Sequence, residues 1–269
     1  MKSYAIHDGD RQDTTAIGYL FYFERAKSFI VELCEDLDEW EAPLLFQSLV
    51  RKGIYTVPRD ISLMWVQERV IPSGRQNIGS ILKNHKLNEY NEVDFLVLSK
   101  GKCSQDNCYI VEVEQVPENI RKRMRKNVRE CFPTADKQLV CMFQDNSVRM
   151  IDLMKVVDKY KDISYVLKHR EILESVEVGA GGYSVLFNGS IEIQSLELNK
   201  LGVLLPLTAD DFYSFVRRNV VDATKACDVL QCSRQNLSYM VKEGKITPII
   251  YGTKEYLYTR GELERIMSE

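Results

Sequence analysis

The pattern of apolar and polar residues predicts both strands and helices at the start of the chain. Residues 18–23 and 28–33 are aromatic and β-branched runs separated by a four-residue loop, a pattern typical of a β-hairpin. Residues 42–51 and 77–86 carry apolar side chains at helical spacing, so we expect a helix in each. Residues 61–71 are apolar and aromatic but fit neither period clearly.

Two further strands and a basic helix are expected next. Residues 93–98 are almost continuously apolar and residues 109–116 alternate, so both are predicted to be strands. Residues 118–132 follow Pro117, which suits the first turn of a helix, and they place an apolar residue in every turn. The opposite face of this helix carries six cations: Arg121, Lys122, Arg123, Arg125, Lys126 and Arg129. We take residues 1–133 as an N-terminal α+β module to which the pattern assigns no role.

A second small α+β domain is expected over residues 135–205. Its expected strands are residues 138–143, 148–151, 172–178, 183–187 and 191–193, with a short helix at residues 153–160. Asn188-Gly189 is a strong signal for a β-hairpin turn. The glycine-rich residues 179–182 follow a strand but open no helix, so they do not match a phosphate-binding loop.

This middle segment resembles a small bacterial α+β family that is known only as a domain of unknown function. The resemblance is carried by the order of the elements and by residues 148–153, 177–178 and 184–189. Members of that family are often joined to helix-turn-helix domains. The resemblance therefore implies a regulatory protein and supplies no chemistry.

The pattern changes to short helices after Asp210. Residues 211–216 are expected to form a lead-in helix. Asp222 or Thr224 can cap a second helix, whose apolar face is formed by Ala223, Ala226, Val229 and Leu230. After a tight turn at residues 231–233, Ser233 can cap a third helix that ends at Gly244. Two helices across a three-residue turn form a helix-turn-helix.

A hairpin and a final helix are expected to follow. Residues 247–251 and 255–258 read as two strands around Gly252-Thr253-Lys254, in the position of a wing. Thr259 and Glu262 have the spacing of a capping box that opens the last helix. The fold class is therefore α+β, with a C-terminal winged helix-turn-helix over residues 210–269.

Residues 221–267 resemble the MerR and excisionase family of winged helix-turn-helix domains. The resemblance rests on residues 224–230, 232–241 and 242–246. The resemblance implies binding to double-stranded DNA. MerR proteins dimerise through a long helix after the wing, whereas this sequence ends two residues past Met267. A homodimer, if one forms, is therefore expected to form through residues 1–205; the alternative is binding as a monomer in the manner of excisionases.

The start of the third helix carries side chains that suit base edges. Arg234 can pair with guanine, and the amides of Gln235 and Asn236 can pair with adenine. Four further residues are placed to reach the flanking phosphates: Ser238, Tyr239, Lys242 and Lys254 at the wing tip. Thr224 and Ser233, at the starts of the two helices, complete the expected DNA-binding set.

Composition and charge limit how the chain could contact DNA and in which compartment it could work. The 269 residues have a formal net charge of −3, so any DNA contact must come from a local basic patch. Residues 217–247 provide one, with six Lys or Arg against three acids. The polar first residues do not resemble a secretion signal, and no apolar run approaches the roughly 20 residues that span a bilayer. The sequence thus favours a cytoplasmic protein without a membrane partner.

Neither a disulfide framework nor a bound metal or cofactor is expected. The seven cysteines form no framework of paired spacings, and the three histidines are far apart. A regulator without catalytic activity is therefore the main expectation. The helix-turn-helix could alternatively serve protein contact.

Two enzymatic alternatives stay open. Asp94, Glu112 and Glu114 on adjacent strands would resemble the Mg²⁺-binding carboxylates of a nuclease, although Glu114 stands where a lysine is usual. Nucleotidyl transfer would use Gly79-Ser80 with Glu92, Asp94 and Glu112, but the strand expected before Gly79 is missing from the pattern. Carboxylates on the polar face of a half-buried strand are, however, common and usually inert.

Overall fold

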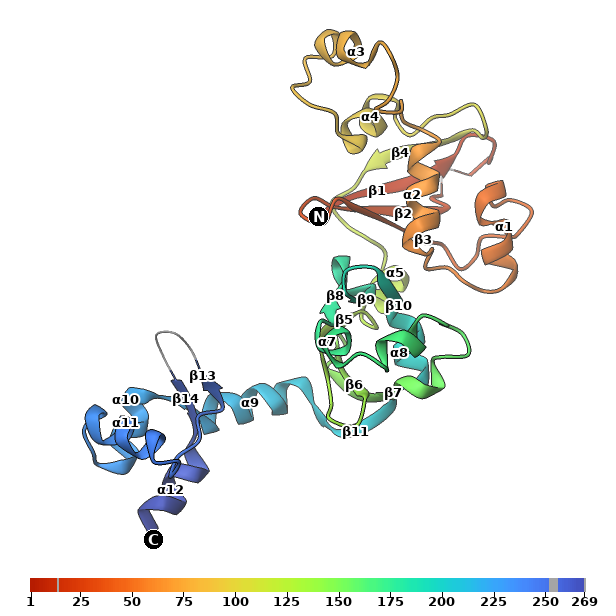
Figure 1. Cartoon of the computed structure of the whole chain (residues 1–269). Helices are drawn as coiled ribbons and strands as arrows, with labels where there is room; N and C mark the ends of the chain where they lie inside the picture. Colours follow the sequence, from red (N-terminus) through yellow and green to blue (C-terminus); the bar gives the residue numbers. More distant parts are fainter. Residues whose placement is uncertain (14, 252–255, 269) are drawn as a thin grey trace.

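The computed structural model describes residues 1–13, 15–251 and 256–268. The chain is of the α+β class, with helices and antiparallel sheets mixed along the sequence. Its elements form three groups in chain order, each around its own hydrophobic core (Figure 1). None of the helices among the described residues has the length and apolar composition that a bilayer crossing requires.

The N-terminal unit is built on a four-stranded antiparallel sheet. Its strands are β1 (Lys2–Asp8), β2 (Gly18–Phe23), β3 (Ser28–Leu33) and β4 (Cys108–Glu112), in the order β3-β2-β1-β4. The predicted hairpin of β2 and β3 is confirmed. The second predicted strand at residues 109–116 is confirmed over its first part only, because β4 ends at Glu112. The sequence pattern did not reveal β1, which pairs with both β2 and β4.

Four helices follow β3, and they are α1 (Leu44–Arg51), α2 (Arg59–Gln67), α3 (Ile78–Asn84) and α4 (Glu92–Leu98). Helices α1 and α3 confirm the expected helices in those regions. The segment at residues 61–71, whose pattern fitted neither period, is helical over its first part, in α2. The buried Trp65 of this helix packs in the core against Phe46.

The prediction of a strand at residues 93–98 is wrong. These residues form α4, whose first turn is capped by the Asn91 side chain accepting from Val93 N at 3.2 Å. Val93, Phe95 and Leu96 are buried, whereas Val97 is 48% exposed, so only one side of the apolar run enters the core. A continuous apolar run fits a buried strand or a helix equally well, and the cap with this one-sided burial decides for the helix.

The single helix predicted over residues 118–132 is wrong in its second half. Helix α5 (Glu118–Met124) ends early, and β5 (Val128–Pro133) pairs with β6 (Gln138–Phe143). Strand pairing therefore outweighs the helical spacing of the apolar residues. The expected boundary near residue 134 falls inside this hairpin, so β5 contributes to the core of the middle unit.

The middle unit contains two antiparallel sheets. One has the order β11-β7-β6-β5 and the other β10-β9-β8. Their remaining strands are β7 (Ser147–Asp152), β8 (Glu177–Val178), β9 (Ser184–Phe187), β10 (Ile191–Gln194) and β11 (Val203–Thr208). The predicted strands in the regions of β6, β7, β9 and β10 are confirmed.

Short helices complete the middle unit. They are η1 (Leu153–Lys155), α6 (Ile163–Val166), α7 (Arg170–Glu174), η2 (Ala180–Gly182) and α8 (Ser195–Leu201). The strand predicted over residues 172–178 is wrong, because α7 takes its first part and only β8 is extended. The helix predicted over residues 153–160 is reduced to the single turn of η1.

A buried ion pair joins α5 to the N-terminal sheet. Glu32 of β3 is fully buried, and its Oε2 accepts hydrogen bonds from Arg123 Nε and from the Thr56 hydroxyl, both at 2.9 Å. The Arg123 guanidinium also donates to the Glu35 carboxylate at 2.7 Å and to the Leu33 carbonyl oxygen. Burial raises the pKa of Glu32, although the charge of Arg123 opposes the shift. Arg123, predicted on the basic outer face, is instead turned inward.

The glycine-rich residues 179–182 also lie against the N-terminal unit. Gly181 has a φ of +60°, and a Cβ there would lie 2.3 Å from the Phe23 ring, so the close approach requires glycine. Asn127 Nδ2 donates to Gly181 O at 3.1 Å, and the rings of Phe23 and Tyr183 pack edge to face at 6.2 Å. This turn thus serves packing between the first two units.

The C-terminal unit follows the helix α9 (Ala209–Asn219), which extends from the middle unit (Figure 1). Its three-stranded sheet has the order β12-β14-β13, with β12 (Val220–Asp222), β13 (Ile250–Tyr251) and β14 (Tyr256–Thr259). Three helices pack on it: α10 (Ala223–Leu230), α11 (Arg234–Lys242) and α12 (Arg260–Ser268). The expected order of helix, turn, helix, hairpin and helix is therefore present.

Candidate nucleic-acid interface

Both helices of the helix-turn-helix begin with a side-chain cap. The Asp222 carboxylate accepts from Lys225 N at 2.9 Å, which selects Asp222 over Thr224 as the cap of α10. The Ser233 hydroxyl accepts from Asn236 N at 3.2 Å and caps α11. Each cap satisfies a backbone N–H that has no partner within its own helix. The sequence therefore determines where both helices start.

The turn between the helices has the geometry of a Schellman motif. Gln231 adopts the left-handed conformation with a φ of 50°. Cys232 N donates to Cys227 O at 3.1 Å, and Gln231 N donates to Asp228 O at 3.4 Å. These two bonds satisfy the carbonyl groups at the end of α10 and fix the direction in which α11 leaves.

The inner face of α11 packs against the core of the unit. Leu237 is buried, and Met240 and Val241 are partly buried. The rest of this core consists mainly of Val221, Ala226, Leu230, Ile246, Tyr258 and Leu263. The Glu262 carboxylate, expected in a capping box, accepts from Thr247 N at 3.2 Å and joins α12 to the segment before the hairpin. The buried face of α11 thus holds its other face toward solvent.

The outer face of α11 is polar and open to solvent. All six candidate DNA-contacting residues of this helix are exposed: Arg234, Gln235, Asn236, Ser238, Tyr239 and Lys242. Tyr239 is 55% exposed, which is high for a large aromatic side chain. Residues 235, 239 and 242 have the spacing of one helical face, so α11 presents an amide, a phenol and an ammonium group side by side.

A hydrogen bond connects two of the candidate residues across the turn. Arg234 Nη2 donates to the hydroxyl of Thr224, in the first turn of α10, at 2.7 Å. This bond uses one of the five guanidinium N–H groups. In the part of the chain that the structure describes, Arg234 forms no ion pair with a carboxylate. Its remaining N–H groups are therefore available for an acceptor outside the protein.

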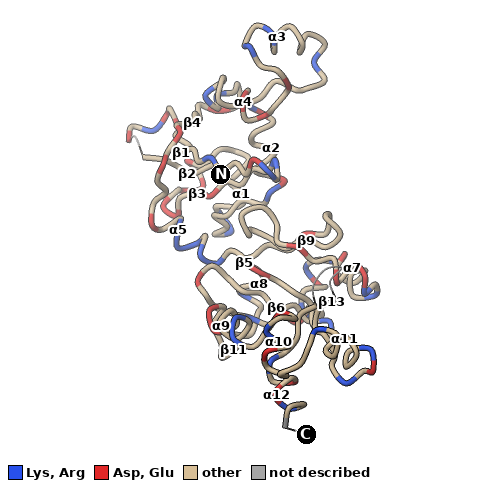
Figure 2. The backbone as a smooth tube through the Cα atoms, turned by 90° about the vertical axis from the view of Figure 1, so that its left-hand side faces the viewer, with Lys and Arg blue, Asp and Glu red and all other residues tan. Residues whose placement is uncertain are grey.

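One cation near this bond lies outside the predicted set. Lys225 follows Thr224 in the first turn of α10 and is exposed. Within residues 1–13, 15–251 and 256–268, Lys225 and Lys242 form no ion pair. Figure 2 shows Lys and Arg positions on both helices. The signal that could have identified Lys225 is its place in the first turn of the helix that crosses the DNA backbone in helix-turn-helix proteins.

The hairpin after α11 occupies the expected wing position. β13 pairs with β14 in an antiparallel register that places Ile250 opposite Leu257. Ile249 and Ile250 are about half exposed, at 49% and 53%. Lys254, the candidate phosphate contact at the tip, lies outside the described residues.

The structural premise of the nuclease alternative is wrong. Asp94 lies in helix α4 and not on a strand beside β4, while Glu112 ends β4 and Glu114 follows it. Gly79 and Ser80 lie inside α3 and are not preceded by a strand, so the nucleotidyltransferase arrangement is not formed either. Among the described residues, no three histidine, cysteine or carboxylate side chains are placed to hold a metal ion.

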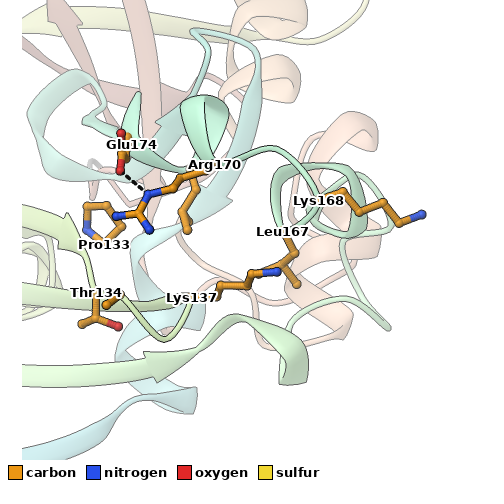
Figure 3. Close-up of a pocket in the computed structure, with 9 residues that line it drawn as sticks. Pro133, Thr134, Lys137, Leu167, Lys168, Arg170 and Glu174 are labelled. Atoms are coloured by element: carbon orange, nitrogen blue, oxygen red, sulfur yellow. Dashed lines mark hydrogen bonds and ion pairs between the residues drawn. The ribbon is translucent and has the colours of Figure 1, made fainter.

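A small surface pocket lies in the middle unit, beside α7 (Figure 3). Its volume is about 170 Å³, whereas typical small-molecule sites enclose roughly 300–1,000 Å³. Arg170 on its wall is paired with Glu174 at 2.7 Å, and the Lys168 side chain points away from the pocket. The charged groups of Arg170 and Lys168 are therefore not directed at a ligand in this pocket.

Comparison of the chain with models of protein families, with curated protein sequences and with solved structures gives no match in any of the three.

Proposed function

We propose that this chain is a sequence-specific DNA-binding protein that acts as a bacterial-type transcriptional regulator in the cytoplasm. The observation that carries the proposal is the exposed polar face of α11, which begins at a capped N-terminus with Arg234 held by Thr224. The resemblance of residues 221–267 to MerR and excisionase domains supports the same reading.

The chemistry of this face suits two kinds of DNA contact. Side chains at the start of a recognition helix reach the base edges of the major groove, where Arg234, Gln235 and Asn236 have donors and acceptors to offer. Ser238, Tyr239 and Lys242 lie further along and suit phosphate oxygens, which position the protein without reading sequence. The proposed readout therefore depends on the first turn of α11.

Selection of bound sequences from random double-stranded DNA tests the proposal, with parallel selections in the presence and absence of Mg²⁺. We expect an enriched motif in both selections. Failure to enrich any sequence would contradict sequence-specific binding and favour the use of this face for protein contact.

The same reactions test the enzymatic alternative, and we expect no cleavage or nucleotide incorporation when Mg²⁺ is present. The physical reason is that Asp94 on α4 and Glu112 on β4 do not form the adjacent-strand arrangement that this chemistry uses. Gel analysis of labelled DNA provides the measurement. Mg²⁺-dependent products that disappear in both Asp94→Ala and Glu112→Ala would show the expectation to be wrong.

Replacing Lys242 by alanine is expected to weaken binding to all DNA sequences equally. Its ammonium group is proposed to neutralise one phosphate, so the slope of log K against log salt should fall by about one unit. Titrations at several salt concentrations, with the selected site and with random DNA, measure the slope. The matched control is Lys168→Ala, which removes an exposed lysine of the middle unit and should leave the slope unchanged. Equal slopes for the wild type and Lys242→Ala would argue against a phosphate contact.

The proposal includes a homodimer formed through residues 1–205. Two recognition helices related by a twofold axis would read two half-sites, so the selected motif would be a palindrome or an inverted repeat. Sedimentation of the full chain measures the oligomeric state. A monomer that selects a single unrepeated motif would remove the dimer from the proposal without affecting the DNA contacts.

A further inference from the structure

Two cysteines meet at the turn of the helix-turn-helix. Cys227 lies in the last turn of α10, and Cys232 follows the left-handed Gln231. The hydrogen bond from Cys232 N to Cys227 O, at 3.1 Å, is the outer bond of the Schellman motif. In this motif the side chains of those two positions characteristically contact each other. The backbone geometry of the turn therefore brings the two thiols together.

The two thiols lie near each other while keeping access to solvent. Cys232 is close enough to Cys227 to raise its pKa, and both side chains pack at the edge of the C-terminal core. Both residues are free and only half-buried. Burial and the neighbouring thiol raise the pKa of Cys227, while the Arg234 guanidinium opposes this shift. The pair is therefore a reduced dithiol that small oxidants can reach.

The other cysteines provide a contrast within the same chain. Cys131 and Cys141 face each other across β5 and β6, but Cys141 is fully buried. Burial raises the pKa of Cys131 and that of Cys108 to about 12, which makes their reactive thiolates scarce at neutral pH; the pKa of Cys227 is raised as well, but there the Arg234 guanidinium opposes the shift. Proximity of two thiols and access to solvent thus coincide at the turn.

We propose that Cys227 and Cys232 are a thiol-oxidation site, at which a peroxide converts the two thiols into one intramolecular disulfide. One thiolate attacks the O–O bond of the peroxide, which yields a sulfenic acid and, from hydrogen peroxide, one water molecule. The other thiolate then attacks the sulfenic sulfur, forms the S–S bond and releases a second water molecule. The two cysteines lose two electrons and two protons, and the peroxide takes them up as it is reduced to the two water molecules.

The disulfide would act on the start of the recognition helix. It holds the two sulfurs at about 2.05 Å with a restricted dihedral angle, which is closer than any contact between two thiols. Cys232 precedes both the cap Ser233 and Arg234, so this shortening shifts the first turn of α11. This step rests on the proposed function, and it predicts that oxidation weakens binding to the selected DNA site at least tenfold.

The chemistry is tested on the full chain without DNA. The reduced protein is exposed to hydrogen peroxide, free thiols are alkylated, and peptides are mapped by mass spectrometry. We expect a peptide with a disulfide between residues 227 and 232 that dithiothreitol reverses, with Cys131 and Cys141 still unlinked. In Cys103→Ser, which removes a half-buried cysteine elsewhere, the same disulfide should form. Its absence from the wild type, or a Cys131–Cys141 bond in its place, overturns the proposal.

Binding of reduced and oxidised protein to the selected DNA separates the two proposals. We expect the tenfold loss in the wild type and no response to peroxide in Cys227→Ser or Cys232→Ser. If the disulfide forms but the affinity for DNA stays unchanged, the proposed effect of oxidation on DNA binding is overturned. If the reduced protein binds no DNA, the proposed function fails, while the peptide map still decides on the oxidation site.

Discussion

Replacing Arg123 by alanine is expected to lower the free energy of unfolding by on the order of 3–5 kcal/mol, because it leaves a buried carboxylate without its ion-pair partner. Glu32 is fully buried, and Arg123 donates to it at 2.9 Å. The change also removes the donors to Glu35 and to the Leu33 carbonyl oxygen. No other cation forms an ion pair with Glu32 in the described part of the chain.

The loss of stability in Arg123→Ala should depend on pH, because the substitution changes the pKa of Glu32. Burial already raises the pKa of Glu32 in the folded state, and removal of the Arg123 charge raises it further. A raised carboxyl pKa means that the folded state binds the proton more tightly than the unfolded chain. The contribution of Glu32 to the free energy of unfolding is therefore most favourable at pH values below the pKa of this carboxyl in the unfolded chain. It is lost as the pH rises through the pKa of the folded state. The variant should accordingly be less destabilised in acid than at neutral pH.

Urea unfolding followed by tryptophan fluorescence measures this effect, because both tryptophans, Trp40 and Trp65, lie in the N-terminal unit. The matched control is Arg121→Ala, which removes an exposed arginine of the same helix that pairs with Glu118 at the surface. Exposed pairs contribute only about 0–1 kcal/mol, so this variant should unfold almost as the wild type does. Equal losses in the two variants would contradict the importance of the buried pair.

Replacing Arg234 by alanine is expected to weaken binding to the selected DNA site by about 1–3 kcal/mol and to relax specificity at one base pair. The guanidinium lies at the start of α11 and is exposed, and its planar donors match the two acceptors of a guanine. Titration of the selected site and of its single-base variants measures both affinity and specificity. Unlike Lys242→Ala, the Arg234 variant should change the ranking of sequences.

Two further variants separate base readout from stability of the fold. Arg234→Lys keeps the charge but cannot make the bidentate contact, so specificity should still relax. Thr224→Val removes the hydroxyl that accepts from Arg234 at 2.7 Å but leaves the guanidinium in place. Thermal unfolding should be monitored for every variant. Unchanged affinity and base preference in a folded Arg234→Ala protein would sink the proposal that α11 reads DNA.

The sequence alone determined the order of helices and hairpin in the C-terminal unit, because their signals are local, whereas it did not reveal strand β12, which pairs with β14. Asp222 and Ser233 cap helices that begin one residue later, and each cap acts over a few residues of backbone. The spacing of Ala226, Leu230 and Leu237 selects the buried faces and, by exclusion, the polar face of α11. Such signals can be read without knowledge of the rest of the fold. The prediction of DNA binding itself stays a prediction.

Tertiary structure decided the elements whose partners lie far along the chain. Strand β1 is polar at both ends, and it becomes recognisable only through its pairing with β4, which follows four helices. Residues 93–98 and 172–178 are short segments that their apolar pattern predicted as strands. The local Asn91 cap and one-sided burial make the first of them helical, whereas α7 has no side-chain cap and buries Leu173 in the core of the middle unit.

The same reason explains which side chains escaped prediction. The basic pattern after Pro117 does not reveal that Arg123 is buried, because its partner Glu32 lies 91 residues earlier in the chain. Nor does it show that Thr224 holds Arg234, since that contact depends on the angle between two helices. Local periodicity records which face of an element is apolar, whereas the packing of distant elements determines what each polar side chain meets.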